Sequence, residues 1–369
     1  MNKYKIYVYA ICKNEEQFAD RWMDAVGEAD GVIVTDTGSE DRTVQKLRAR
    51  GAVVYEEKIS PWRFDVARTI SLNHVPEDAD ICVCNDLDEV FEPGWREKLE
   101  AVWKPEHTRA KYLFTWSFNP DGTPLKQFPM EKIHRRHGFR WIHPVHELLE
   151  YSGEDPESIV WVDGLVLNHY PDLTKPRSQY LPLLELSAKE NPLDDRTVFW
   201  LGREYMYYGK YDESIATLQQ HLRLPTALWA EERSASMRFI ARCYEAKGDY
   251  AQAKSWLWRA MAEYSAAREP YLAMAKIGYL EKDWPLTYAM IKKALNIVQP
   301  SGSYLVDPES WGAMPYDYGA ISAFRLGLPE EALMFAKTAC EQNPEDKRLQ
   351  ANLQLIEQAL AKQESKEGD

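Results

Sequence analysis

The sequence predicts an α/β domain with a mostly parallel sheet, followed by an all-α region of repeated helical hairpins. Two observations support this prediction. Up to about residue 170, apolar strand-like segments alternate with segments of helical spacing, as in βαβ units. After about residue 176 the strand-like segments stop and one turn pattern recurs. The chain has 369 residues, which is long enough for two such domains.

The first half is expected to contain four strands separated by three helices. The strands are apolar runs, predicted over 5–12, 30–37, 51–59 and 79–88. The helices show apolar residues three and four positions apart, and they are predicted over 15–26, 41–50 and 64–75. Asp41 near the start of the second helix and Gly51 after its end mark its limits. A later apolar run, 159–168, is also strand-like.

A turn pattern that occurs four times organises the second half. Each copy begins with a small or polar residue, and a small residue follows in the next helix. The copies begin at Gly209, Gly248, Lys282 and Gly327, which are 39, 34 and 45 residues apart. Helical hairpins of the tetratricopeptide type repeat about every 34 residues with a W-x2-L-G-x2-Y start, which "VFWLGREYMYYGKYDESIATL" fits. The alternative is an ordinary helical bundle.

These patterns divide the chain into four parts. Residues 1–175 form the α/β domain, and 176–197 form a linker with one connecting helix, "SQYLPLLELSAKEN". Residues 198–362 form the helical repeats, with an inserted loop at 298–315, and 363–369 are expected to be a disordered tail.

Charge and composition narrow the class of protein. A formal net charge of -13 argues against a basic nucleic-acid-binding face. No window offers the roughly 20 apolar residues of a membrane span. Five cysteines without a CxxC pair favour a reducing, cytoplasmic location. The N-terminal apolar run is cut short by charged residues, so it is expected to be a strand rather than a signal peptide.

Carboxylates gather where the fourth predicted strand ends, in "ADICVCNDLDEVFEPGW". Ligands collect at the carboxyl ends of parallel strands. Asp86 and Asp88 have the D-x-D spacing that can hold Mg²⁺ or Mn²⁺ together with substrate phosphates. The alternative is a solvated acidic turn.

Two other segments carry candidate ligand-binding residues. In "VTDTGSEDRT", Asp36 ends the second strand, where it could accept a hydrogen bond from a base or ribose. The alternative is a capped strand-to-helix turn, with Ser39 as the cap. In "WRFDVARTISL", Arg63 and Arg68 suit phosphate contacts. The alternative for these arginines is a solvated, ion-paired helix face.

Together with "AICKNEE" and "WIHPVHE", these segments resemble the inverting glycosyltransferases of family 2 over roughly residues 4–170. The resemblance implies a Rossmann-like GT-A fold that binds a nucleotide sugar. It implies that Asp36 binds the base, that Arg68 contacts the nucleotide, and that Asp86 and Asp88 contact ribose and metal. It further implies that His169 completes the metal site. The other donor-binding candidates are Asn14, Glu15 and Arg63.

Inverting transfer needs a general base within hydrogen-bond reach of the acceptor. In "PVHELLE", Glu147 is the candidate, placed by Pro144 at the start of a predicted helix, and His146 is its rival. A structural His–Glu pair is the alternative. A nearby basic patch could lie over the diphosphate or be a solvated turn. It comprises Arg135, Arg136 and Arg140.

The sequence thus predicts a metal-dependent inverting glycosyltransferase that uses Mn²⁺ or Mg²⁺. Its donor would be a nucleotide sugar, with UDP the expected nucleotide, and its acceptor a protein, peptide or saccharide. The repeats would bind the acceptor or form a homodimer. Bacterial and prophage enzymes, peptide S-glycosyltransferases among them, are similar in combining these parts. The rival interpretation is an inactive nucleotide-sugar-binding scaffold that acts through its repeats. A nucleotidyltransferase would be expected to carry a glycine-rich phosphate loop, which "AICKNEEQ" lacks.

Overall fold

The chain forms two compact units, residues 1–187 and 188–369. The structure is a computed structural model that describes residues 3–172 and 178–367. The boundary between the units falls inside the segment predicted as a linker, 176–197. Each unit has its own hydrophobic core and is described by itself.

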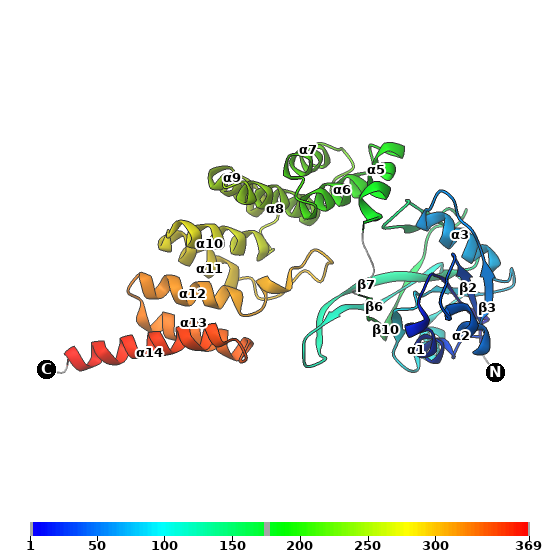
Figure 1. The fold of residues 1–369 in the computed structure, drawn as a ribbon, viewed down its shortest axis with the longest axis horizontal. Helices are drawn as coiled ribbons and strands as arrows, with labels where there is room; N and C mark the ends of the chain where they lie inside the picture. Colours follow the sequence, from blue (N-terminus) through cyan, green and yellow to red (C-terminus); the bar gives the residue numbers. More distant parts are fainter. Residues whose placement is uncertain (1–2, 173–177, 368–369) are drawn as a thin grey trace. The chain divides into compact units, whose positions relative to one another are not determined.

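The first unit contains an eight-stranded sheet in the order β3-β2-β1-β4-β7-β6-β10-β5 (Figure 1). Strands β3, β2, β1 and β4 are parallel, whereas β7 runs antiparallel to both β4 and β6. The strands are β1 Ile6–Cys12, β2 Gly31–Asp36, β3 Val53–Glu56, β4 Ile81–Cys84, β5 Glu89–Phe91, β6 Arg109–Phe118, β7 Pro124–Arg135 and β10 Ile159–His169. The four predicted strands and the later strand-like run are confirmed.

Helices cover both faces of this sheet. They are α1 Glu16–Val26, α2 Thr43–Ala49, α3 Phe64–His74 and α4 Trp95–Val102. Alternate residues of β1 point to opposite layers, as the two-residue period of a strand requires. Ile6, Val8 and Ala10 pack in the core that α1, α2 and α4 complete. Tyr9 packs in a smaller core with Leu72 of α3.

A two-stranded sheet, β8 Phe139–Ile142 and β9 Leu148–Tyr151, completes that smaller core. We predicted a helix after Pro144, and this prediction was wrong. Trp141 pairs with Leu149 across the two strands, and both side chains are buried in the smaller core. The helical spacing of "HELLE" therefore gives way to cross-strand packing.

The second unit is a series of antiparallel helical hairpins (Figure 1). The hairpins pair α6 with α7, α8 with α9, α10 with α11 and α12 with α13. Helix α5, Tyr180–Glu190, crosses the boundary between the units. The helices of the second unit are α6 Asp195–Tyr207, α7 Tyr211–His221, α8 Ala230–Ala246, α9 Tyr250–Glu263, α10 Glu269–Glu281, α11 Trp284–Leu295, α12 Met314–Arg325, α13 Pro329–Gln342 and α14 Lys347–Glu367. Helix α5 confirms the predicted connecting helix.

Each of the four predicted turns joins the two helices of one hairpin. All four opening residues have a positive φ between 61° and 77°, a region where glycine is favoured. The small residue that follows each turn is fully buried against the preceding helix. Ser214 lies close to the backbone of the preceding helix, and its hydroxyl donates to the carbonyl of Gly202 at 2.7 Å.

Two further features of the second unit bear on the predictions. The inserted loop contains a short 3-10 helix, Pro308–Ser310, and buries Leu305. Helix α14 extends to Glu367, past residue 363, where we expected a disordered tail to begin; residues 368–369 lie outside the described part. Within the described residues, no helix combines the length and apolarity that crossing a bilayer requires.

A buried histidine at the centre of the first unit must stay neutral. The Nδ1 atom of His134 donates to the carbonyl of Arg135 at 2.7 Å, so its Nε2 accepts from the hydroxyl of Tyr9 at 2.9 Å. The Tyr9 oxygen in turn accepts from the indole N–H of Trp141 at 2.9 Å. Burial lowers the pKa of His134 from 6.5 to about 3.

This depressed pKa predicts a pH dependence of stability. Between pH 6.5 and about 3 the unfolded chain binds a proton at His134 that the folded chain does not, so stability falls as the pH falls. The slope from this one group is at most about 1.4 kcal/mol per pH unit. In urea unfolding at pH 7, 6, 5 and 4, His134→Gln should show a shallower slope than the wild type. His137→Gln, at an exposed position, should keep the wild-type slope. Equal slopes for all three proteins would contradict the assignment.

Candidate functional site

The candidate site lies at the point where the strand order reverses. From β1 the chain continues to β2 and β3 on one side, and β4 then returns to the other side of β1. In open α/β sheets, ligands bind in the crevice at the carboxyl ends of the strands beside such a reversal. Asp86 and Asp88 follow the end of β4, so the sheet places them where the sequence predicted.

Asp86 is held by two cations from different elements. Arg68, in the middle of α3, donates from both terminal nitrogens to the two carboxylate oxygens at 2.6 and 2.9 Å. Lys132 of β7 donates to the same carboxylate at 3.4 Å and to Glu89 at 2.7 and 3.0 Å. Burial by itself would raise the pKa of Asp86, but Arg68 and Lys132 hold it well below its usual range.

Glu89 and Lys132 form a buried ion pair within this network. Burial raises the pKa of Glu89, although Lys132 opposes the shift. Burial would lower the pKa of Lys132, but Asp86 and Glu89 raise it well above its ordinary value. The sequence analysis did not single out Lys132. It precedes Ile133, the antiparallel partner of Val83 near the end of β4, and only that strand pairing brings it to the carboxylates.

Arg68 also joins the candidate base to this network. Its Nε donates to Oε1 of Glu147 at 2.5 Å, and its guanidinium lies 5.2 Å from the ring of Trp141. Arg68 is only 7% exposed. Glu147 precedes strand β9 instead of opening a helix. The rival base, His146, has its ring 5.8 Å from that of Tyr180.

Asp88 is paired with the histidine that the family resemblance singled out. Nε2 of His169 lies 3.3 Å from the Asp88 carboxylate. The imidazole stacks on Trp116 at 4.7 Å, and its Nδ1 donates to the Trp116 carbonyl at 3.4 Å. Burial would lower the pKa of His169, but the hydrogen bond and charge of Asp88 raise it. The last residue of β10 and the acidic loop therefore meet, and the metal role of His169 stays a prediction.

These residues suit a divalent cation in part. Two ligands of an octahedral ion, each about 2.1 Å from it, lie about 3 Å apart when they are neighbours. The Asp88 and His169 atoms have nearly this spacing, so they could hold Mn²⁺ or Mg²⁺ while phosphate and water complete its shell. Asp86, predicted as a further ligand, is turned instead toward Arg68 and Lys132.

The second-strand carboxylate stabilises its own turn. Asp36 is 2% exposed and accepts hydrogen bonds from the backbone N–H groups of Gly38 and Ser39 at 3.0 and 2.9 Å, and one from the Ser39 hydroxyl. This is the strand-to-helix turn that we considered as the alternative, but the side chain of Asp36 closes it. Ser39 does not cap the next helix; Asp41 accepts the Thr43 N–H at its start.

Asn14 and Glu15 lie beside this turn, after the end of β1. The side-chain oxygen of Asn14 accepts from the N–H of Glu40 at 2.8 Å. The backbone N–H of Glu15 donates to the hydroxyl of Thr43 at 2.7 Å. These contacts brace the loops that follow β1 and β2 against each other.

The remaining predicted arginines have other acidic partners. Arg63 flanks the start of α3 and pairs with Asp65 at 2.8 Å. Arg135 is opposite Ile81, the first residue of β4, and so is at the other end of that strand from Asp86. The prediction that this patch lies over the diphosphate was therefore wrong for a diphosphate bound at the acidic loop, because β7 runs antiparallel to β4. Its other two members also have local partners: Arg136 contacts Glu77 at 3.3 Å, and Arg140 contacts Glu150 at 2.6 Å.

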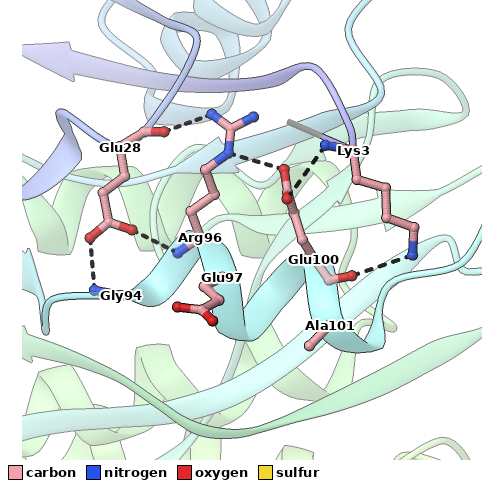
Figure 2. A pocket seen from close by; sticks show the side chains of 7 residues that line it. All are labelled: Lys3, Glu28, Gly94, Arg96, Glu97, Glu100 and Ala101. Carbon is pink, nitrogen blue, oxygen red and sulfur yellow. Dashed lines mark hydrogen bonds and ion pairs between the residues drawn. The ribbon is translucent and has the colours of Figure 1, made fainter. Parts of the chain in front are cut away.

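A separate open hollow of about 580 Å³ holds none of the predicted site residues. Figure 2 shows that its polar groups bond mainly to one another. Arg96 donates to the Glu28 carbonyl at 2.7 Å and to the Glu100 carboxylate at 3.0 Å, and Glu28 accepts from the N–H of Gly94 at 2.7 Å. This network fastens α4 to the loop after α1, and we assign the hollow a structural role. Its lining residues are Lys3, Glu28, Gly94, Arg96, Glu97, Glu100 and Ala101.

Similarity to known proteins is found among solved structures. No family model matches the chain, and no curated protein matches it. Among solved structures, the Cut9–Hcn1 hetero-tetramer of APC/C is 14% identical with a TM-score of 0.40, and the match covers 50% of this chain but 33% of that one. TTC0263, a thermophilic TPR protein of Thermus thermophilus, is 22% identical with a TM-score of 0.34, over 48% of this chain and 89% of that one. YrrB, described as a TPR protein with an unusual peptide-binding site, is 13% identical with a TM-score of 0.38. The match covers 47% of this chain and 81% of that one.

The chain has a mixed α/β sheet unit followed by a unit of helical hairpins. Over about half of its length it is similar to solved TPR proteins. At these identities and TM-scores the likeness says nothing about activity.

Arg68 should be essential for stability, because its removal leaves Asp86 and Glu147 without their shared guanidinium. Breaking a buried ion pair by removing one partner costs about 3–5 kcal/mol. We expect Arg68→Met to lower the free energy of unfolding by about that amount in urea titrations at pH 7. Arg140→Met removes an exposed pair with Glu150 and should cost less than about 1 kcal/mol. Similar losses for the two variants would refute the central role of Arg68.

Proposed function

We propose that this chain is a metal-dependent inverting glycosyltransferase that transfers a sugar from a UDP-linked donor to a protein, peptide or saccharide acceptor. One observation is its main support. At the strand-order reversal, the Asp88–His169 pair and the Glu147–Arg68–Asp86 chain of ion pairs occupy the same acidic loop region. A candidate cation-binding pair and a candidate base would thus share one scaffold, as sugar transfer from a diphosphate requires.

The charge of this region supports the need for a metal. Four carboxylates, those of Asp86, Asp88, Glu89 and Glu147, face two permanent cations, Arg68 and Lys132. The two cations already have carboxylate partners, so a diphosphate brought here would meet excess negative charge. A Mn²⁺ or Mg²⁺ ion, when bound, would neutralise the diphosphate and favour its departure.

In this proposal, Glu147 takes the acceptor proton. Arg68 contacts its Oε1, and Oε2 accepts no hydrogen bond from the described residues. The side chain is 12% exposed, so a small part of it reaches the surface. The guanidinium fixes the direction of the carboxylate, which a general base needs in order to meet the acceptor hydroxyl, thiol or amine. Asp36, Asn14 and Glu15 would then contact the base and ribose from the neighbouring strand ends.

The second candidate function is the inactive scaffold. The observation that favours it is that Asp36 and Asp86 already have full sets of protein partners. In that case the repeats would do the work, either by binding an acceptor-like partner or by forming a homodimer. Turnover of a nucleotide sugar separates the two functions, because a scaffold binds without turnover.

The first functional prediction concerns the metal. We expect the purified chain to hydrolyse at least one UDP-sugar slowly with Mn²⁺, and to lose this activity in excess EDTA. Asp88→Asn should abolish turnover, because the amide cannot supply the carboxylate ligand. Mass spectrometry of the turnover of a panel of nucleotide sugars measures the effect of EDTA and the effect of the substitution. Asp121→Asn, in an exposed turn on the β6–β7 hairpin, is the matched control. Full activity in EDTA, or in Asp88→Asn, would rule out this metal site.

The second functional prediction concerns the general base. Glu147→Gln should keep donor affinity, measured by calorimetry, and lose about 10² to 10⁴ in turnover rate, since the amide cannot accept a proton. His146→Gln should remain within a few-fold of the wild type. If His146→Gln loses the activity while Glu147→Gln retains it, the two roles are exchanged.

A further inference from the structure

A buried histidine in the helical unit faces two carboxylates from two other helices. His221 lies in the last turn of α7 and is fully buried, with its ring 5.6 Å from that of Phe199. Asp195 is in the first turn of α6, and Glu232 is in the first turn of α8. One ligand atom of each residue lies within 4.8 Å of the other two. The first two hairpins therefore place three metal-ligand side chains together.

The geometry at the imidazole suits joint ligation better than a hydrogen bond. Nε2 of His221 lies 3.3 Å from Oε1 of Glu232, yet this nitrogen has no hydrogen-bond partner among the described residues. Two ligands of a tetrahedral ion, each about 2.0–2.1 Å from it, lie about 3.3 Å apart. A bound ion would lie along the lone-pair direction of Nε2, and the Glu232 oxygen would lie to one side of that direction. An N–H group on Nε2 would then point away from this oxygen and form a poor hydrogen bond.

Outer contacts fix both of these ligands. Nδ1 of His221 lies 2.9 Å from the hydroxyl of Ser236, which is one turn after Glu232 on α8. Oε2 of Glu232 accepts a hydrogen bond from the hydroxyl of Tyr304 at 2.8 Å. Metal-binding histidines commonly donate their second ring nitrogen to such a partner, and ligating carboxylates are held in the same way. Neither contact uses the atoms that face the cluster.

We propose that Asp195, His221 and Glu232 bind one divalent transition-metal ion, of the Zn²⁺ type, that ties α6, α7 and α8 together. One imidazole nitrogen with two carboxylate oxygens is a ligand set that Zn²⁺ accepts, and water would take the fourth position. Asp195 is half-buried, so an ion can enter from its side, while the other two ligands are enclosed. This site is independent of the sugar-transfer site in the first unit.

The test uses the full-length protein, stripped with a chelator and titrated with Zn²⁺ alone. Because the Asp88–His169 pair could also take Zn²⁺, the background is Asp88→Asn. We expect this protein to retain one equivalent of zinc after dialysis, measured by mass spectrometry of the metal. Zinc at about 100 times its dissociation constant should raise the melting temperature of the helical unit by about 5–10 °C.

Substitutions within this background locate the ion. Asp195→Asn and Glu232→Gln are nearly isosteric, and each should abolish both the retained zinc and the thermal shift. Ser236→Ala should weaken zinc binding by about 10- to 100-fold, since it removes only the outer contact. Glu231→Gln is the matched control, because this neighbouring carboxylate accepts from Ser301 and Ser303 instead. It should bind zinc normally.

The same measurements can overturn the proposal. Circular dichroism of each variant separates loss of metal from loss of fold, and the half-buried Asp195→Asn is the variant least expected to disturb packing. A folded background protein that retains no zinc refutes the site, and the three side chains then have only a structural role. Full zinc retention by both Asp195→Asn and Glu232→Gln refutes it equally.

Discussion

The buried guanidinium of Arg68 is the interaction on which the first unit depends. It neutralises Asp86 at the end of β4 and Glu147 before β9, two carboxylates 61 positions apart in the chain. The Asp86 side chain is 27% exposed and that of Glu147 12%, and carboxylates removed from water to this extent need a partner that replaces their hydration. Helix α3 therefore has to lie against both the main sheet and the β8–β9 sheet, and this fixes the layer that carries the candidate base.

The same electrostatic requirement explains why the acidic loop is ordered. Lys132 joins Asp86 to Glu89, and His169 pairs with Asp88, so each of these carboxylates has a partner from another strand or helix. Partners of this kind direct the carboxylates and hold them at fixed spacing, which a binding site needs and a solvated turn does not supply. A divalent ion with a diphosphate would enter a region whose shape is already set.

The two units reach their order in different ways. The first depends on pairings distant in sequence, such as β10 with β6 and α3 with β1, so its site is assembled from many segments. The second repeats one local solution, a positive-φ turn followed by a small buried residue. Yet it also brings a histidine and a carboxylate to 3.3 Å, as the first unit does with Asp88 and His169. In both units, additional hydrogen bonds to residues distant in sequence hold the histidine or the carboxylate in place.

The sequence by itself determined what short-range patterns can specify. Apolar runs that alternate with segments of helical spacing predicted the first four strands and three helices. The turns at Gly209, Gly248, Lys282 and Gly327 predicted the hairpins. Both patterns depend only on residues close in sequence. It also placed Asp86 and Asp88 at a strand end. Tertiary structure alone decided that Lys132 and not Arg135 lies beside Asp86, since this follows from the antiparallel direction of β7. It likewise decided that Glu147 precedes a strand, because a helical spacing over five residues is weaker than the burial of Trp141 against Leu149 across β8 and β9.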